Sequence, residues 1–234
     1  MQYCEDEDKS SVKVILFGAT GMVGSGVLKE CLDDSRVTSI LVVGRSTCLV
    51  KHKKLREVIH NDFFDYTLIK NKLDGYDACF FCLGVSAAGK SEAEYQRLTY
   101  DLTLTAGETL AELNPNLTFC YVSGLGTDST ERGRIMWARV KGKTENHLLR
   151  LPFKAAFMFR PGYIQPVKGV RSKTMLYRIF YLFLAPLYPV LRRLFPRQVT
   201  TTENIGRAMI RVALDGYPNS VIDTQGINML AVAD

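Results

Sequence analysis

The sequence is poor in metal-binding residues and lacks long apolar segments. Its 234 residues include three histidines, His52, His60 and His147, which are far apart, so we expect no metal site. The first eleven residues, MQYCEDEDKSS, are acidic and have no apolar core, so we expect no N-terminal signal. In the very apolar segment 175–197, the longest uncharged run is 179–191 and has thirteen residues, whereas a membrane span needs about 20. These absences favour a cytoplasmic protein.

The six cysteines lack the regular spacing of a disulfide framework or a metal site. The closest pair, Cys79 and Cys82, lies in the run DACFFCLG, whose composition predicts a buried strand. Because residues three apart on a strand face opposite sides of the sheet, this pair is not expected to form a redox site. We expect reduced thiols that pack in the core.

Strand and helix patterns alternate along the chain. Apolar runs predict strands at 11–17, 38–44, 56–62, 76–84, 117–124 and 154–160. Apolar residues at helical spacing predict helices at 22–32, 91–113, 137–149 and 200–214, the last capped by a run of threonines. This order predicts an α/β fold, a doubly wound parallel sheet with a small C-terminal helical or irregular subregion. The length suits one domain over 1–234.

Three glycines stand where the first predicted strand passes into the first helix. The run VILFGATGMVG places Gly18, Gly21 and Gly24 at intervals of three. Such a turn lets a diphosphate approach the backbone at the positive end of a helix, so it predicts a dinucleotide site. A tight turn without ligand is the alternative. The residues expected to contact the cofactor are Gly18, Thr20, Gly21, Met22, Val23 and Gly24.

No acidic residue follows the second predicted strand. A site for NAD(H) usually has an acid there to bind the ribose hydroxyls. This chain has Arg45, with Ser46 beside it and Lys51, Lys53 and Lys54 beyond. A guanidinium suits a 2′-phosphate, so Arg45 and Ser46 favour NADP(H) over NAD(H). The alternative is that Arg45 is a solvated loop charge.

Several segments resemble, in order, those of one enzyme superfamily over residues 12–215. These segments are GATGMVG, HNDFFD, FCLGVSAAGKSEAEYQRLTYDLTLTAGETLAEL, YVSGLGTDS, VKGKTENHLL and FMFRPGYIQP. They are similar to motifs of the extended and atypical short-chain dehydrogenase/reductase superfamily, which has a Rossmann fold. The branch they resemble most is that of Tat-interacting and NmrA-like proteins, often labelled nucleoside-diphosphate-sugar epimerases.

The resemblance implies roles for further residues. It implies a cofactor-binding core at 12–165 and a C-terminal region at 166–234 that covers the cleft. Ser123 and Lys141 correspond to active-site residues, and the turn at 160–166 corresponds to the segment that closes over the nicotinamide. The remaining cofactor contacts implied are Asp62 and Phe63 at the adenine, Cys82, Leu83 and Gly84 beside the cofactor, Lys141 at the ribose, and Pro161, Gly162 and Tyr163 in the closing turn.

One residue departs from the superfamily pattern. The proton-donating tyrosine normally stands four residues before the lysine, and here that position is Trp137. An indole N–H has no acidity near neutral pH, so Trp137 cannot act as a general acid. Tyr121, Tyr163 and Asp128 are possible replacements, although an aspartate at such a place is more often a loop cap.

Two functions therefore remain open from the sequence. The chain is an NADP(H)-dependent oxidoreductase or epimerase-like enzyme for an unknown carbonyl or sugar-nucleotide substrate, with another group or water supplying the proton. Alternatively, it is a non-catalytic NADP(H)-sensing regulator or scaffold, like NmrA-type proteins. A homodimer is common among relatives of this fold, and nothing in the sequence demonstrates one.

A third, weaker hypothesis comes from charge. Residues 146–202 contain ten basic residues and no acidic one, which suggests an anionic partner. Within this region, residues 175–197 are apolar with basic ends. They predict a pair of helices that covers the cleft or forms a subunit contact. The alternative is a helix that lies on a membrane surface. Nucleic-acid binding is not expected, because no recognised module is present.

Overall fold

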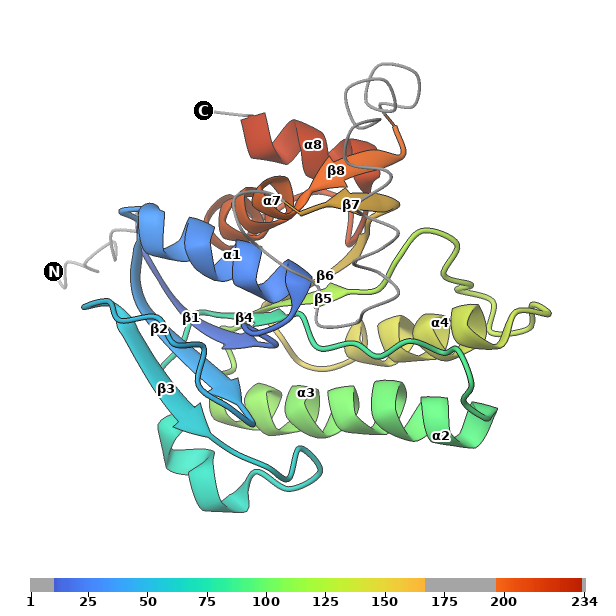
Figure 1. Ribbon diagram of the computed structural model, residues 1–234, viewed down its shortest axis with the longest axis horizontal. Coiled ribbons are helices and arrows are strands. Elements are labelled where there is room, and N and C mark those ends of the chain that lie inside the picture. The colour runs from blue at the N-terminus through green and yellow to red at the C-terminus, as the bar shows by residue number, and fades with distance from the viewer. Residues whose placement is uncertain (1–10, 167–196, 233–234) are drawn as a thin grey trace, which may run out of the picture.

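A seven-stranded parallel sheet forms the centre of the molecule (Figure 1). The computed structural model describes residues 11–166 and 197–232. The strand order is β3-β2-β1-β4-β5-β6-β9. The strands are β1 (Val12–Phe17), β2 (Val37–Gly44), β3 (Leu55–Ile59), β4 (Ala78–Phe81), β5 (Thr118–Val122), β6 (Ala155–Arg160) and β9 (Val221–Asp223). Six of the seven coincide with predicted strands, and the predicted doubly wound α/β fold is confirmed.

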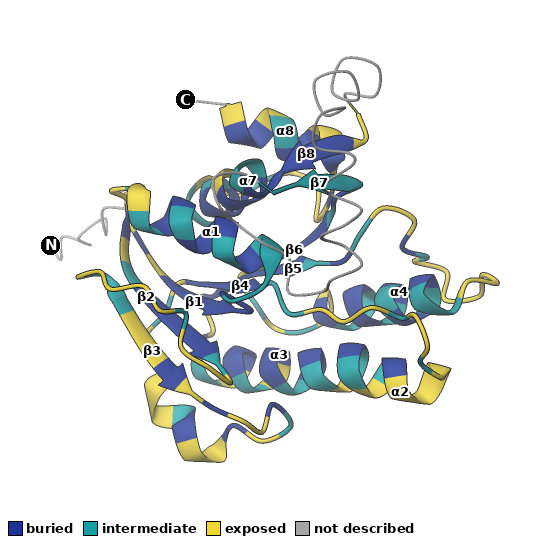
Figure 2. Cartoon of the chain, in the orientation of Figure 1, coloured by how far each residue is buried: buried dark blue, intermediate teal, exposed yellow. Residues whose placement is uncertain are grey.

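Helices cover both faces of the sheet. One face carries α1 (Met22–Asp33), α7 (Thr202–Asp215) and α8 (Thr224–Val232), whose apolar side chains join one buried cluster. The other carries α2 (Glu92–Gln96), α3 (Leu102–Leu113), α4 (Met136–Leu148) and the 3₁₀ helix η1 (Thr67–Lys72). Figure 2 shows the buried residues concentrated on the strands and on the inward sides of these helices. This arrangement leaves the carboxyl ends of the strands free to form a site.

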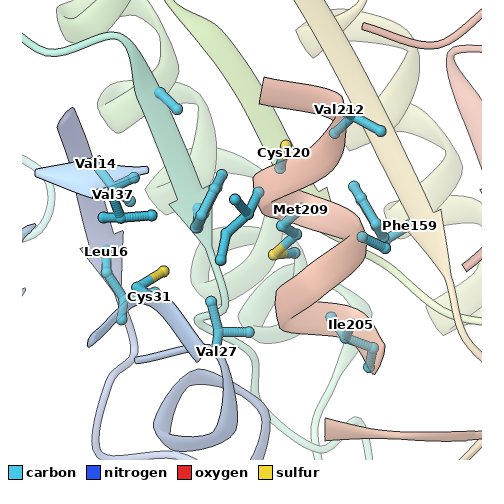
Figure 3. Close-up of a cluster of buried hydrophobic side chains, with 14 of the residues drawn as sticks. Val14, Leu16, Val27, Cys31, Val37, Cys120, Phe159, Ile205, Met209 and Val212 are labelled. Atoms are coloured by element: carbon cyan, nitrogen blue, oxygen red, sulfur yellow. The ribbon is translucent and has the colours of Figure 1, made fainter. Parts of the chain in front are cut away.

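The sheet alternates its side chains between the two clusters. Val14 and Leu16 of β1 point to the face that α1 and α7 cover and belong to the same buried cluster as Ile205 and Met209 of α7 (Figure 3), whereas Ile15 belongs to the opposite cluster. Such near-continuous apolar strands are typical of parallel sheets that are buried on both faces.

The two neighbouring cysteines follow the same alternation. Cys79 belongs to the α3 side and Cys82 packs against the α7 side, as their spacing predicts. Both are free thiols.

Two predicted helices differ in detail from the structure. The helix predicted at 91–113 is interrupted by a π-helical turn, η2 (Arg97–Asp101), and it begins at a capping box in which the Ser91 hydroxyl accepts a hydrogen bond from the Glu94 backbone N–H. The helix predicted at 200–214 corresponds to α7, which starts at Thr202 rather than at Thr200. As predicted, a threonine caps it: Thr201 Oγ1 accepts a hydrogen bond from the Asn204 backbone N–H at 3.0 Å.

The C-terminal region contributes to the core more than the sequence indicates. Strand β9 pairs with β6 in the main sheet, and a short second sheet joins β7 (Tyr163–Gln165) to β8 (Val199–Thr201). Helix α7 lies so close to α1 that a Cβ on Gly26 would lie 2.4 Å from Thr202 Cβ. The division of the chain at residue 165 stays a prediction, but part of the region beyond it builds the sheet and its cover.

The hypotheses on residues 175–197 lie, apart from Arg197, outside the described residues. In the described ranges, no helix combines the length and the apolar character needed to cross a membrane.

Candidate functional site

The glycine turn at the end of β1 leaves no room for side chains at two of its positions. Gly18 has φ +82°, and a Cβ there would lie 2.7 Å from the Cys82 carbonyl oxygen. A Cβ on Gly24 would lie 2.1 Å from the Gly18 carbonyl oxygen. The turn is therefore pressed against both the loop after β4 and the first turn of α1. The closest atom to a Cβ on Gly21 is the Gly18 carbonyl oxygen at 3.2 Å, so this middle glycine is the least crowded of the three.

Backbone donors at the start of α1 are left for a ligand. Gly21 is the N-cap, so no side chain caps the helix, and its first turn has no acidic residue. Thr20, Gly21, Met22 and Val23 are partly exposed, whereas Gly18 and Gly24 are buried. The Gly21 backbone N–H donates to the Gly18 carbonyl oxygen at 2.9 Å, so the donors left at the start of the helix are those of Met22 and Val23. Such donors and the helix dipole favour an anion. The residues predicted for a diphosphate lie together at this turn, and their binding role stays a prediction.

The basic residues after β2 separate into two groups. Arg45 and Ser46 follow β2 directly and are exposed, and Arg45 has no ion-pair partner among the described residues. Lys54, in contrast, donates to the carbonyl oxygens of Leu32 and Asp34 at 3.1 and 2.6 Å. These carbonyls lie at the C-terminal end of α1, opposite the glycine turn. Lys54 therefore lies away from Arg45, because the parallel strand β3 begins at the amino-terminal edge of the sheet, opposite the end of β2.

The predicted adenine residues have different environments. Asp62 is exposed, and one of its carboxylate oxygens accepts a hydrogen bond from the Phe64 backbone N–H at 2.9 Å. The Phe63 ring is buried and packs edge-on against Phe17 with the centroids 6.2 Å apart. The Phe63 side chain is thus a core residue, and only its backbone is available to a ligand.

The predicted loop after β4 does lie against the glycine turn. The Cys82 backbone N–H donates to the Phe17 carbonyl oxygen at 3.1 Å, which holds the loop beside the end of β1. The Cys82 side chain is directed into the core, where burial raises the pKa of its thiol to about 12. Leu83 is half-buried and packs against the opposite cluster, and Gly84 has open space around it. The backbone of this loop is therefore what can face a cofactor.

A pocket of about 650 Å³ opens at the carboxyl ends of β5 and β6. It brings together six of the predicted site residues, Ser123, Trp137, Lys141, Pro161, Gly162 and Tyr163. Six further lining residues were not among the predicted site residues: Val122, Gly124, Leu125, Ile164, Gln198 and Val199. Gln198 and Val199 reach the pocket because β8 pairs with β7, and no motif signals that pairing.

Ser123 and Lys141 contact each other in the pocket, although not through the serine hydroxyl. The Lys141 ammonium donates to the Ser123 carbonyl oxygen, and the Ser123 hydroxyl donates to the Phe159 carbonyl oxygen at 3.1 Å. Burial lowers the pKa of Lys141 to about 8, and the charge of Glu145 partly opposes this shift. A lysine with such a pKa can exchange a proton near neutral pH.

A buried ion pair holds the helix that carries Lys141. The Arg160 guanidinium binds the Glu145 carboxylate, with Nε 3.0 Å from Oε1, and it also donates to the Ser129 hydroxyl at 2.5 Å. Glu145 is 1% exposed. A Cβ on Gly142 would lie 1.8 Å from the Asp128 carbonyl oxygen, so the loop between β5 and α4 is packed directly on the helix. These contacts position one wall of the pocket.

The candidates for the missing proton donor differ in their access to the pocket. Trp137 lines it, and the indole N–H has no hydrogen-bond partner among the described residues. Tyr121 is wrong as a candidate, because its ring is buried in the core on the α3 side, where burial raises the pKa of its hydroxyl. Tyr163 lines the pocket and its hydroxyl donates to Gln165 Oε1 at 2.8 Å.

Asp128 is a loop cap rather than a proton donor. Its carboxylate accepts hydrogen bonds from the Thr130 hydroxyl and from the Gly133 backbone N–H, both at 2.6 Å. The hydrogen bond from the Thr130 hydroxyl contributes most to lowering the pKa of Asp128, and the bond from the Gly133 N–H adds to it. A carboxylate held in this way stays charged at neutral pH and has no proton to give.

The glycine turn and the pocket share one edge of the sheet. Strand β4 lies between β1 and β5, so two strand spacings, roughly 10 Å, separate Gly18 from Ser123. An extended ligand can therefore run from the turn to the pocket along the carboxyl ends of the strands, where open α/β sheets bind their ligands.

Comparison with known proteins gives distant relatives. No family model matches the chain. Rat protein HTATIP2 is 26% identical over 160 residues, which cover 68% of this chain and 65% of that protein. The mitochondrial protein FMP52-2 of Scheffersomyces stipitis is 27% identical over 150 residues, 63% of this chain and 64% of that protein. The chain thus matches slightly less than two thirds of the length of these curated relatives.

Solved structures share the fold at low identity. WbmF of Bordetella bronchiseptica, in complex with NAD+, superposes with a TM-score of 0.66 at 17% identity and covers 95% of this chain and 77% of its own. ADP-L-glycero-D-manno-heptose-6-epimerase of Helicobacter pylori has a TM-score of 0.64 at 15% identity, over 97% of this chain and 83% of its own. These likenesses confirm the Rossmann-like fold.

Together these relatives and structures confirm the predicted resemblance to the atypical short-chain dehydrogenase/reductase superfamily. One expectation is overturned. Five relatives, including FMP52 of Candida albicans, are named as mitochondrial proteins, so the expected cytoplasmic location is wrong by this comparison.

Proposed function

We propose that this chain, an atypical short-chain dehydrogenase/reductase by its resemblances, binds NADP(H) and reduces a carbonyl group in the pocket beside Lys141. The observation that carries the proposal is the turn between β1 and α1. Two of its glycines admit no Cβ, the middle one is less crowded, and the following helix begins without a side-chain cap. A ligand-free turn has no need for this combination.

Each part of the site along the carboxyl ends of the strands has a role in this proposal. The backbone N–H groups of Met22 and Val23 at the start of α1 bind the diphosphate, whereas that of Gly21 donates to the Gly18 carbonyl oxygen at 2.9 Å. Arg45, exposed and without an ion-pair partner in the described part of the chain, binds the 2′-phosphate with Ser46 beside it.

The remaining predicted residues complete the cofactor site. Asp62 and the backbone of Phe63 serve the adenine end, the loop at 82–84 lies beneath the cofactor, and Pro161, Gly162 and Tyr163 flank the pocket end. The bound nucleotide supplies a hydride.

Lys141 takes the part of proton donor in this arrangement. Its ammonium lines the pocket and gives one hydrogen bond to the Ser123 carbonyl, which leaves two N–H groups for a substrate oxygen. With a pKa of about 8, it can release a proton to an oxygen that gains negative charge. Ser123 holds the ammonium in place through its backbone, and Trp137 forms an apolar wall.

Calorimetric titration with NADPH, NADP+, NADH and NAD+ tests the cofactor assignment. We expect NADPH and NADP+ to bind more tightly than NADH and NAD+. Gly24→Ala is expected to weaken the binding of all four nucleotides, because the added Cβ would push α1 away from the turn. Gly26→Ala is the matched control: it disturbs the same helix against Thr202 and does not touch the turn. Failure of the wild-type chain to bind any of the four would refute the proposal.

A second candidate function is an NADP(H) sensor without catalysis. Two observations favour it: Trp137 replaces the usual acid, and the Ser123 hydroxyl is engaged by Phe159. Trp137→Tyr separates the two functions when NADPH consumption is followed with a panel of aldehydes and ketones. Turnover by the wild-type chain supports the enzyme. Turnover by the variant alone, with nucleotide binding intact in both, supports the sensor.

Location and association are further parts of the proposal. The names of the fungal relatives favour a mitochondrial location, which fractionation of cells that express the chain would test. Homodimer formation, and membrane-surface contact through 175–197, stay predictions from the sequence.

A further inference from the structure

The described wall of the pocket is mostly apolar. Its apolar side chains come from β5 and the loop after it, from α4, and from the segments at β7 and β8: Val122, Leu125, Trp137, Pro161, Ile164 and Val199. Lys141 is the only charged residue among the described residues that line it. A surface of this kind gains affinity by burying apolar ligand surface, with few polar groups to orient the ligand.

The polar groups of the wall are largely engaged by the protein itself. The Ser123 hydroxyl donates to the Phe159 carbonyl oxygen at 3.1 Å, and the Tyr163 hydroxyl donates to Gln165 Oε1 at 2.8 Å. Gln198 is exposed at the rim. The Lys141 ammonium keeps two N–H groups, enough to bind one oxygen atom.

These features disfavour a nucleotide sugar. A diphosphate is best bound by guanidinium groups or several backbone donors, and each sugar hydroxyl needs partners in the site. A buried hydroxyl without a partner lowers affinity by roughly tenfold or more. Apart from the single ammonium and the indole N–H of Trp137, the described wall offers little to a ligand of that class.

We infer that the pocket accepts an uncharged, largely apolar carbonyl compound whose oxygen lies at the Lys141 ammonium, and that it rejects sugar nucleotides. The inference rests on the proposed function in one respect: it takes this pocket as the place of the substrate. It adds the substrate class, which the fold does not specify, because one fold serves many chemistries.

The chain contains its own reporter for this inference. Trp137 is the only tryptophan and lines the pocket, so all tryptophan emission comes from the site. We would measure quenching of this emission by acrylamide in the presence of 2-octanone or of UDP-glucose, each with and without NADP+. We expect 2-octanone to shield Trp137 and UDP-glucose to shield it less or not at all. Absence of shielding by 2-octanone, or equal or stronger shielding by UDP-glucose, overturns the inference.

Variants show whether the apolar wall is responsible. Leu125→Asn changes a residue that is 52% exposed, so the fold should tolerate it. We expect the 2-octanone concentration that gives half-maximal shielding of Trp137, the midpoint, to rise roughly tenfold. Leu68→Asn makes the same chemical change at an exposed residue outside the pocket and should leave the midpoint unchanged. Lys141→Met should also weaken the ketone roughly tenfold, because it removes the charged donor. Equal midpoints in all four proteins contradict the inference.

The failure of this inference can be told from failure of the proposed function. If NADPH binds in the calorimeter and UDP-glucose shields Trp137, the cofactor proposal stands and the substrate class is wrong. If 2-octanone shields Trp137 and no nicotinamide nucleotide binds, the pocket preference stands and the proposed function is wrong.

Discussion

Replacement of Lys141 by methionine should change how the stability of the protein depends on pH. The ammonium is half-buried beside the Ser123 carbonyl, and burial lowers the pKa of Lys141 from 10.5 to about 8. In the unfolded chain the pKa returns to about 10.4. Between these two values the unfolded chain holds a proton on Lys141 that the native protein has released.

The sign and size of the effect follow from proton linkage. Because the unfolded state binds more protons in this window, the free energy of unfolding contributed by Lys141 rises with pH between about 8 and 10.5. A shift of this size corresponds to about 3 kcal/mol once the pH passes the unfolded pKa. Lys141→Met has no such proton, so its stability should lack this rise.

Other buried groups act in the opposite direction. Burial raises the pKa of Cys31, Cys79, Cys120 and Tyr66, so their unfolded forms release protons first and stability falls as the pH rises above about 9. These groups are common to both proteins. The difference between wild type and variant therefore isolates Lys141.

Urea unfolding of both proteins at intervals from pH 7 to pH 10.5 measures the difference, with linear extrapolation to water. Wild type should gain about 3 kcal/mol relative to Lys141→Met over this range. Lys141→Arg is the second comparison, since a guanidinium stays protonated throughout and should give a profile as flat as that of methionine. A constant difference between wild type and both variants would show that the burial of Lys141 does not lower its pKa.

Three further predictions concern the site and its support. Arg45→Ala should leave stability unchanged, because the side chain is exposed. In calorimetry it should weaken NADPH binding by about 10- to 100-fold, as expected for the loss of a charged hydrogen bond, and leave NADH binding unaffected. An equal loss of affinity for both nucleotides would refute the role in 2′-phosphate binding. Gly142→Ala should lower the free energy of unfolding by about 1–3 kcal/mol, because its Cβ meets the Asp128 carbonyl oxygen, and unchanged urea midpoints would contradict this. Glu145→Gln should lower the free energy of unfolding by about 3–5 kcal/mol, because it leaves the Arg160 guanidinium without its carboxylate partner. A change in the thermal unfolding midpoint of only a degree or two would argue against this.

The parts of the fold that depend on local pattern could be predicted from the sequence. Six strands and the helices at α1, α3, α4 and α7 follow from the spacing of their apolar residues. The glycine turn follows as well, because Gly18 and Gly24 meet atoms that are close in sequence or lie on the adjacent strand. Local sterics decide these features, and local sterics can be read from residue types.

Contacts between distant segments could not be predicted in the same way. Lys54 stands close to Arg45 in the sequence, but the intervening chain returns to the amino-terminal ends of the strands, so Lys54 lies at the end of α1 instead. Tyr121 stands two residues before Ser123, yet it points into the core while Ser123 lines the pocket. Strand direction decides the first case, and the position of Ser123 just beyond the end of β5 decides the second.

The sequence by itself determined the α/β alternation and the glycine turn, and it predicted an anion site at that turn and the loss of the usual tyrosine at position 137. The tertiary structure alone decided that Gln198 and Val199 complete the pocket, that β9 extends the sheet, and that Arg160 binds Glu145 behind Lys141. The physical reason is that a turn depends on the backbone conformations of a few consecutive residues. A pocket wall or a buried ion pair depends on which distant segments pack together, and that is decided by burial of the whole chain.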